Sequence, residues 1–258
     1  MLKFHPKSGV RVLVTAGASG IGRVIAGAFV EAGARVHVSD IDTTALATCA
    51  STLGVSTTVA DVSKEDTVAG MVDDAVKALG GLDILINNAG IAGPTGAVDG
   101  LETKAWRQTI DINLNGQFYC AHYAVPHLRN SGEAAIINMS SSAGRFGYAY
   151  RTPYAASKWA IIGFTQSLAK ELGPDGIRVN AILPGIVKGP RMEGVIRARA
   201  VQMGVSYETM EAEYLGRISL RQMVSPEDIA ATALFLCSQA GWMISGASIP
   251  VCGNLESL

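Results

Sequence analysis

Two side chains four residues apart have the clearest chemical use in this sequence. Tyr154 and Lys158 frame the run YAASK, and the small and apolar residues that follow it favour a helix. Residues four apart on a helix project from the same face, so the ammonium group is expected near the phenol. An isolated phenol titrates near pKa 10. A cation about 4–6 Å away favours the phenolate by roughly 3–4 kcal/mol at an effective dielectric constant of about 20, which makes such a phenol a usable acid and base near neutral pH.

An ordinary surface pair on an amphipathic helix is the alternative interpretation of Tyr154 and Lys158. Two other stretches favour chemistry. The apolar run AAIINM ends in three serines, of which Ser141 lies thirteen residues before Tyr154. Near the N-terminus, the glycine-rich turn AGASGIG lies between the apolar run VRVLVT and a helix pattern. Such a turn brings backbone N–H groups and the positive end of a helix dipole to a pyrophosphate.

Together these stretches resemble the short-chain dehydrogenase/reductase (SDR) family over essentially the whole chain. The alternation of strand and helix patterns itself favours a doubly wound α/β fold with a parallel sheet. The resemblance implies a single Rossmann-type domain over residues 1–258, with seven parallel strands in the order 3-2-1-4-5-6-7 and helices on both faces. It also implies NAD-dependent hydride transfer between the nicotinamide and a secondary alcohol or ketone.

The same resemblance implies four catalytic residues. Tyr154 exchanges the hydroxyl proton, Lys158 stabilises the phenolate and binds the nicotinamide ribose, and Ser141 orients the substrate oxygen. Asn113, in the run DINLNG, completes a proton relay through its main chain. The alternative for Asn113 is a buried polar residue that breaks the long helix predicted over 101–129, and the two interpretations are compatible.

Cofactor contacts are implied by position. The family pattern TGxxxGxG is matched at Thr15, Gly20 and Gly22, but Ala16 replaces its first glycine. Two other departures are Gly189, where the family usually has Thr, and Cys252, where Asp is common. The expected cofactor-binding residues are Gly17, Ser19, Gly20, Ile21, Gly22, Asp40, Ile41, Asp61, Val62, Asn88, Ala89, Gly90, Tyr154, Lys158, Pro184, Gly185 and Val187.

Asp40 ends the second strand pattern, about twenty residues after the glycine turn. A carboxylate there accepts hydrogen bonds from ribose hydroxyls and repels a 2′-phosphate, which predicts NAD in preference to NADP. No basic residue offsets it, because Ile41 follows and Ser19 stands where NADP enzymes of this family often carry Lys or Arg. The alternative is that Asp40 caps the helix that begins near Thr43.

The substrate side is less defined. Residues 188–225 are too long for a plain loop and predict two short helices that form a lid. Arginines and tyrosines near the entrance indicate a polar substrate such as a sugar, polyol or hydroxy acid. The aromatic bend equally allows reduction of a hydrophobic or aryl ketone, and solvated or interface side chains are the other interpretation. The substrate candidates are Ser141, Arg145, Tyr148, Arg151 and Arg191.

Composition narrows the class of protein. A net charge of −1 and a pI near 6.4 do not provide the excess positive charge that is typical of proteins that bind nucleic acid or an anionic membrane. The four cysteines lack metal-type spacing, so we expect no metal site and a cytoplasmic location. Only 17% of the residues are charged while 48% are hydrophobic, which favours subunit contacts. The family resemblance implies a homo-oligomer, a homotetramer or a dimer. A catalytically silent NAD-sensing protein and a Rossmann-type methyltransferase are the rival functions.

Overall fold

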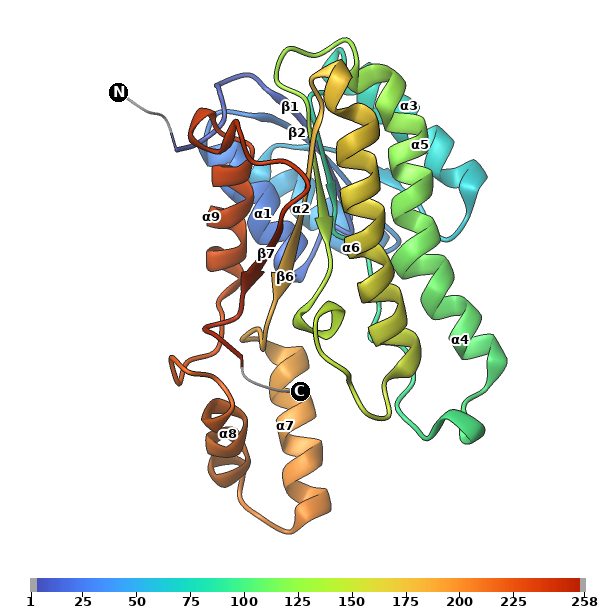
Figure 1. Cartoon of the computed structure of the whole chain (residues 1–258). Helices are drawn as coiled ribbons and strands as arrows, with labels where there is room; N and C mark the ends of the chain where they lie inside the picture. Colours follow the sequence, from blue (N-terminus) through green and yellow to red (C-terminus); the bar gives the residue numbers. More distant parts are fainter. Residues whose placement is uncertain (1–3, 256–258) are drawn as a thin grey trace.

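Seven strands form one parallel sheet in the order β3-β2-β1-β4-β5-β6-β7 (Figure 1), which confirms the predicted order. The computed structural model describes residues 4–255, so residues 1–3 and 256–258 of the expected domain lie outside the described part. The strands are β1 (Arg11–Thr15), β2 (Arg35–Asp40), β3 (Ser56–Val59), β4 (Ile84–Asn87), β5 (Ala135–Met139), β6 (Arg178–Pro184) and β7 (Ser248–Val251). All neighbours pair in parallel, so their carboxyl ends share one edge, where open α/β sheets bind ligands.

Successive residues of the central strands pack into two separate apolar layers. Val12 and Val14 of β1 lie in the layer beneath α1, α2 and α9, whereas Leu13 lies in the layer beneath α3 and α5. Side chains alternate between the faces of a strand, so a sheet covered on both sides needs continuous apolar strands. That requirement explains the uninterrupted apolar runs of β1 and β4.

Helices cover both faces of the sheet (Figure 1). One face carries α1 (Gly20–Glu31), α2 (Thr43–Leu53) and α9 (Pro226–Leu236), and the other carries α3 (Glu65–Leu79), α5 (Gly116–Leu128) and α6 (Thr152–Leu172). A π-helical turn at Asp111–Asn115 joins α4 (Thr103–Ile110) to α5, which confirms the predicted long helix with a break. Such turns are rare and often occur at functional sites.

The start of α2 decides between the two interpretations of Asp40. Asp42 caps α2, because its Oδ1 accepts hydrogen bonds from the N–H groups of Thr44 at 2.9 Å and Ala45 at 3.0 Å. Asp40 is the last residue of β2, and its carboxylate turns toward the glycine-rich turn. The alternative that Asp40 caps this helix is therefore wrong.

Residues 188–225 contain the two predicted helices, α7 (Pro190–Met203) and α8 (Tyr207–Gly216). Both extend beyond the sheet at the end where β6 finishes, and α4 lies at the same end (Figure 1). Ile196 and Ala200 of α7 pack with Met210 of α8 in a small apolar cluster of their own. In the described range 4–255, no helix has the length and apolar character needed to cross a membrane.

Candidate active site

The glycine-rich turn between β1 and α1 is held by Asn88 from the end of β4. Asn88 Nδ2 donates to the carbonyl oxygens of Thr15 and Ala16, both at 3.0 Å, and the Asn88 N–H donates to Thr15 Oγ1 at 3.0 Å. A Cβ atom on Gly22 would lie 2.3 Å from Ala16 O and 2.5 Å from Asn88 Nδ2. Gly22 is therefore required for this turn. Ala16 adopts a left-handed conformation with φ of 47°, which explains why the family has glycine there.

The first turn of α1 fits an anionic group such as a pyrophosphate. Ser19 is the N-cap residue, but its side chain makes no capping hydrogen bond, and the first turn contains no acidic residue. The backbone N–H groups at the start of a helix then suit an external acceptor. Gly17, Ser19, Gly20, Ile21 and Gly22 all belong to this turn or to the start of α1, so the structure brings these predicted cofactor residues together.

Asp40 lies directly beside this turn. Its Oδ2 accepts a hydrogen bond from the Ala18 N–H at 3.2 Å, and its Oδ1 accepts one from the Ile41 N–H at 2.8 Å. The Ile41 side chain is exposed. These contacts fix the carboxylate at the carboxyl edge of β2, where a ribose bound over the glycine turn would meet it.

The remaining predicted cofactor residues lie after β3, β4 and β6. Asp61 Oδ1 accepts from the Ser63 N–H at 3.0 Å, and Val62 is buried. Ala89 donates its N–H to Thr15 Oγ1 at 3.1 Å. Three further positions, Pro184, Gly185 and Val187, lie at and beyond the end of β6, with the Gly185 N–H bound to Val251 O at 2.9 Å.

The three serines after β5 have different partners. Ser140 donates to Lys158 O at 2.7 Å and Ser142 donates to Pro184 O at 3.2 Å, so both satisfy backbone carbonyls. Ser141 Oγ accepts from the Ala143 N–H at 3.2 Å. Among residues 4–255 it has no acceptor for its own hydrogen, which leaves that hydrogen available for a substrate oxygen.

Tyr154 and Lys158 lie on α6 as predicted, and Lys158 reaches under the tyrosine ring. Lys158 is buried, its Nζ lies 5.7 Å from the centre of the Tyr154 ring, and it donates to Met139 O at 2.9 Å. A Cβ on Gly90 would lie 3.4 Å from Lys158 Nζ and 3.2 Å from Asn113 Oδ1. The lysine, the asparagine and the cofactor loop therefore meet at Gly90.

Asn113 lies in the π-helical turn and is fully buried. Its Oδ1 accepts from the Ile91 N–H at 2.7 Å, and its Nδ2 donates to Ile91 O at 3.0 Å and Ser157 Oγ at 3.1 Å. Asn113 thus joins the loop after β4 to α6, one residue before Lys158. Asn113 is therefore a buried polar residue at the break in the long helix, and its part in a proton relay stays a prediction.

Of the predicted substrate residues, Tyr148 and Arg151 lie against the catalytic helix. The guanidinium carbon of Arg151 is 5.2 Å from the ring centres of both Tyr148 and Tyr154. Arg145 is exposed. Arg191 lies in the first turn of α7, but its side chain is outside the described part of the structure.

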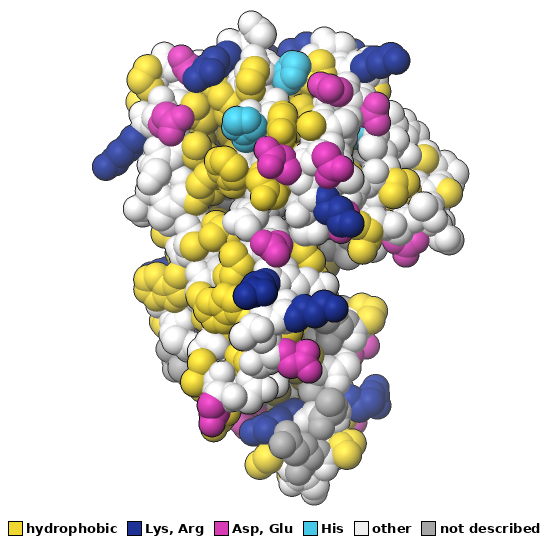
Figure 2. Space-filling model, turned by 90° about the vertical axis from the view of Figure 1, so that its right-hand side faces the viewer, with side chains coloured by type: hydrophobic (Ala, Val, Ile, Leu, Met, Phe, Trp, Pro, Cys, Tyr) yellow, Lys and Arg dark blue, Asp and Glu magenta, His cyan; other side chains and the backbone are white. Residues whose placement is uncertain are grey.

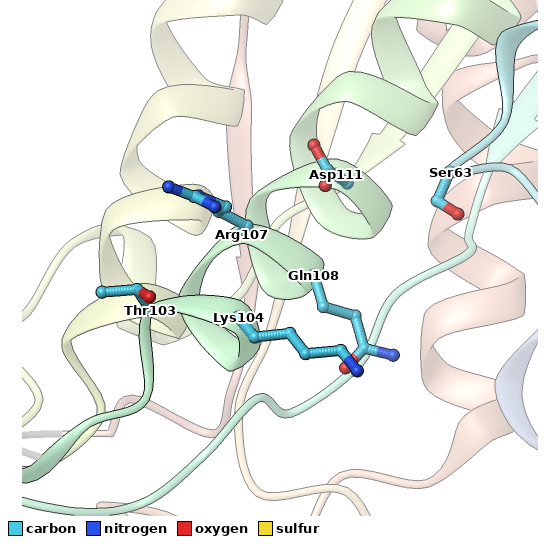
Figure 3. A pocket seen from close by; sticks show the side chains of 6 residues that line it. All are labelled: Ser63, Thr103, Lys104, Arg107, Gln108 and Asp111. Atoms are coloured by element: carbon cyan, nitrogen blue, oxygen red, sulfur yellow. The ribbon is translucent and has the colours of Figure 1, made fainter.

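A separate shallow hollow of about 500 Å³ lies beside α4 (Figure 3). Lys104 and Gln108 extend from α4 in the same direction, and Ser63 lies opposite them on the segment after Asp61 and Val62. Its lining residues are Ser63, Thr103, Lys104, Arg107, Gln108 and Asp111. None of the predicted catalytic residues lines it, and its lysine and arginine are exposed, so the hollow is distinct from the candidate active site. In the described part of the chain, no group of three or more His, Cys, Asp or Glu side chains could hold a metal ion.

The fold is the Rossmann-type fold of nucleotide-binding proteins, and comparison with known proteins gives its family. A family model described as enoyl-(acyl carrier protein) reductase matches residues 15–254. The chain is 35% identical over 253 residues to cis-4-hydroxycyclohexanecarboxylate dehydrogenase of Sinomonas cyclohexanicum, covering 95% of this chain and 96% of that protein. It is 36% identical over 228 residues to 2-dehydro-3-deoxy-L-rhamnonate dehydrogenase (NAD(+)) of Sphingomonas sp. (strain SKA58), covering 88% and 87% of the two chains.

The chain is also similar in fold to a solved structure. L-sorbose reductase from Gluconobacter frateurii, complexed with NADPH and L-sorbose, superposes with a TM-score of 0.91 at 27% identity and 98% coverage of both chains. The chain therefore belongs to the short-chain dehydrogenase/reductase family, whose members use nicotinamide cofactors in dehydrogenation and reduction at CH–OH groups.

Sequence reasoning missed the roles of two residues that shape this site. Thr15 Oγ1 accepts two N–H groups from the loop after β4, and Met139 supplies the carbonyl that holds Lys158. Thr15 was visible only as part of a motif, and no sequence signal distinguishes Met139.

Proposed function

We propose that this protein is an NAD-dependent oxidoreductase that transfers a hydride between the nicotinamide and a secondary alcohol or its ketone. We further propose a polar substrate, such as a sugar, polyol or hydroxy acid. The observation that carries the proposal is that Lys158, whose Nζ lies 5.7 Å from the centre of the Tyr154 ring, meets Asn113 at Gly90. This geometry supports a cation and a proton relay beside the phenol.

Each residue has one task in the proposed reaction. When bound, the nicotinamide accepts or supplies the hydride. In the oxidation direction, Tyr154 takes the proton of the substrate hydroxyl, and Ser141 donates a hydrogen bond that orients the substrate oxygen. Lys158 stabilises the phenolate by its charge, and the backbone around Asn113 passes the proton on toward solvent.

The preference for NAD is supported by Asp40, by the exposed Ile41 and by the absence of a basic residue at Ser19. A carboxylate held against the glycine turn by the Ala18 N–H repels a 2′-phosphate. Membership of the family does not choose between the cofactors, because one relative is named for NAD(+) and one similar structure contains NADPH. The proposal therefore depends on the side chains of this chain.

A polar substrate is supported by two independent features. The relatives named above act on a hydroxycyclohexanecarboxylate and a deoxy sugar acid, and the similar structure contains a sugar. In this chain, the Ser141 hydroxyl hydrogen is available at the end of β5, and Tyr148 lies against Arg151 at the start of α6. We keep Arg145 and Arg191 as further candidates for binding an anionic group of the substrate.

The test is the absorbance of reduced nicotinamide after the protein is mixed with either NAD or NADP and a panel of sugars, polyols, hydroxy acids and aryl alcohols. The expected result is NAD-dependent reduction with at least one polar alcohol. A neutral hydrophobic alcohol preferred by orders of magnitude would contradict the substrate class, and a preference for NADP would contradict the cofactor assignment.

Assembly as a homo-oligomer, a tetramer or a dimer, is part of the same proposal. Large apolar side chains are exposed on consecutive helices, Trp106 on α4, Phe118 on α5 and Trp159 on α6. Figure 2 shows apolar side chains gathered on the side of the molecule that α4 and α5 form. Such a patch favours contact with another copy of the chain, and light scattering would measure the mass. A cytoplasmic location stays a prediction.

A further inference from the structure

Arg151 is the residue just before α6, and its guanidinium lies between two tyrosine rings. Its Cζ is 5.2 Å from the ring centre of Tyr148 and 5.2 Å from that of Tyr154. Its Nη2 donates to Ala92 O at 2.8 Å, and its Nε is buried without a hydrogen-bond partner among residues 4–255. Arginine can stack the face of its planar guanidinium on an aromatic ring. Its N–H groups lie in the guanidinium plane and remain able to donate hydrogen bonds to neighbouring acceptors. These contacts fix the guanidinium at the face of the proposed catalytic tyrosine.

The backbone before Arg151 is strained in a way that supports this placement. Tyr150 adopts a left-handed conformation with φ of 63°, which is costly for a residue with a bulky side chain. Tyr150 O accepts a hydrogen bond from the Gly96 N–H at 2.9 Å, which helps to hold the turn. The fold therefore maintains an unfavourable turn immediately before the arginine that covers Tyr154.

Arg151 also holds the loop that follows the cofactor segment. Ala92, its hydrogen-bond acceptor, is adjacent to Ile91, which Asn113 binds through both its N–H and its carbonyl. Two side chains of the site thus hold two neighbouring residues of one loop. This arrangement keeps the start of α6 at a fixed position relative to Gly90 and Lys158.

The Arg151 guanidinium also lies over the Tyr148 ring. Cations and aromatic rings therefore alternate at the start of α6, in the order Lys158, Tyr154, Arg151 and Tyr148. In α8, burial raises the pKa of Tyr214, whose ring centre lies 5.7 Å from the guanidinium carbon of Arg217.

We propose that Arg151 is a positioning residue for the hydride-transfer reaction, which clamps the Tyr154 ring and adds a second positive charge beside the phenolate. This inference rests on the proposed function. It gives Arg151 a role different from the substrate contact expected from the sequence, because the contacts of its guanidinium are made to Tyr148, Tyr154 and Ala92. The positive charge favours the phenolate from the helical turn before Tyr154, whereas Lys158 favours it from the turn after.

Two cations lie over the Tyr154 ring, Arg151 and Lys158. Tyr148, in the bend after β5, contacts the same Arg151 guanidinium. In α8, Tyr214 interacts electrostatically with Tyr148, Arg217 and Arg199. Loss of Arg151 therefore removes one of two positive charges beside the Tyr154 phenol.

The direct test measures ionisation of Tyr154 without any substrate. The ultraviolet absorbance of tyrosinate is titrated with pH for the protein and for its Tyr154→Phe variant with NADH present, and the difference isolates Tyr154. The same difference is then measured in Arg151→Gln and Arg151→Lys backgrounds. We expect the midpoint to rise by about one pH unit in Arg151→Gln and to change little in Arg151→Lys. Because no turnover is needed, this result stands apart from the outcome for the proposed function.

Activity gives the second readout once a substrate has been found. Arg151→Gln is expected to lower kcat by about tenfold or more and to move the acidic limb of the pH profile upward, with NADH affinity within about twofold. Arg151→Lys should restore the pH profile but only part of kcat, because lysine keeps the charge and loses the flat stacking surface. Arg129→Gln, which removes an arginine from a surface ion pair with Asp175, is the matched control and should change neither readout.

Equal tyrosinate midpoints in the Arg151→Gln and parent backgrounds would overturn the proposal, whatever the activity. If Arg151→Gln fails to fold in a thermal unfolding scan, Arg151→Met provides the neutral variant with a similar stem. An upward midpoint in either neutral variant, restored by lysine, supports the proposal.

Discussion

Replacing Asp40 by asparagine should change the choice of cofactor while leaving the fold intact. The carboxylate is held at the glycine turn by the Ala18 N–H at 3.2 Å and by the Ile41 N–H at 2.8 Å. A negative charge about 5 Å from one unit of charge on a 2′-phosphate costs about 3 kcal/mol at an effective dielectric constant of about 20, which corresponds to a few hundredfold in affinity. Asparagine keeps the shape of the side chain and removes this repulsion. We therefore expect the ratio of kcat/KM for NAD to kcat/KM for NADP to fall by about a hundredfold, mainly through a better NADP value.

The assay compares initial rates with the two cofactors for the protein, for Asp40→Asn and for Asp42→Asn. The second variant changes the net charge equally, but Asp42 caps α2 through the Thr44 and Ala45 N–H groups instead of facing the glycine turn. Asp42→Asn should change the free energy of unfolding by no more than about 0.5 kcal/mol, because asparagine caps helices about as well as aspartate, and should leave the cofactor ratio unchanged. A ratio that stays within about threefold in Asp40→Asn, or that falls equally in Asp42→Asn, refutes the reasoning.

Three further predictions concern stability and the glycine turn. Burial lowers the pKa of His37 to about 4, whereas a histidine in the unfolded chain titrates near 6.5. Between these two pH values the unfolded chain binds a proton that the folded protein does not. The free energy of unfolding should therefore fall by up to about 3 kcal/mol as the pH drops from about 6.5 to about 4. Urea unfolding should show this decline in the protein and a shallower one in His37→Gln; identical slopes would contradict it. Gly22→Ala should weaken NADH binding at least tenfold, because the new Cβ would lie 2.3 Å from Ala16 O. Gly27→Ala in the same helix is the control and should leave NADH affinity unchanged, because the atom nearest to its Cβ is 3.7 Å away. Ala16→Gly should raise the free energy of unfolding by about 0.5–1 kcal/mol in urea titrations, because it removes a left-handed alanine at φ of 47°, and a lower stability would show that the turn is not strained there.

The fold was predictable because its signals are local and repeated. Buried apolar runs, helix caps and the glycine turn each fix one element, and at the start of α9, for example, Ser225 and Asp228 form a capping box. Family resemblance then supplied the strand order, which single elements do not contain. Positions at the ends of parallel strands converge in space whatever the intervening sequence, so Ser141, Asn88 and Asp40 could be placed at one edge in advance.

Contacts between distant segments could not be predicted in the same way. Two carboxylates, Asp40 and Asp42, precede α2, and only the position of the glycine turn determines which of them is free to cap the helix. The stacking of Arg151 on Tyr154 depends on a strained turn at Tyr150. Such geometry arises from packing rather than from residue spacing.

The central claim is that Tyr154 is the proton-transfer group of a nicotinamide-dependent oxidoreductase. The most direct measurement is turnover and NADH affinity in parallel for the protein and for Tyr154→Phe, which removes one oxygen atom. We predict NADH affinity within about twofold and a loss of turnover on the order of a thousandfold or more. Turnover within about tenfold of the parent protein, with NADH bound normally, would contradict the account.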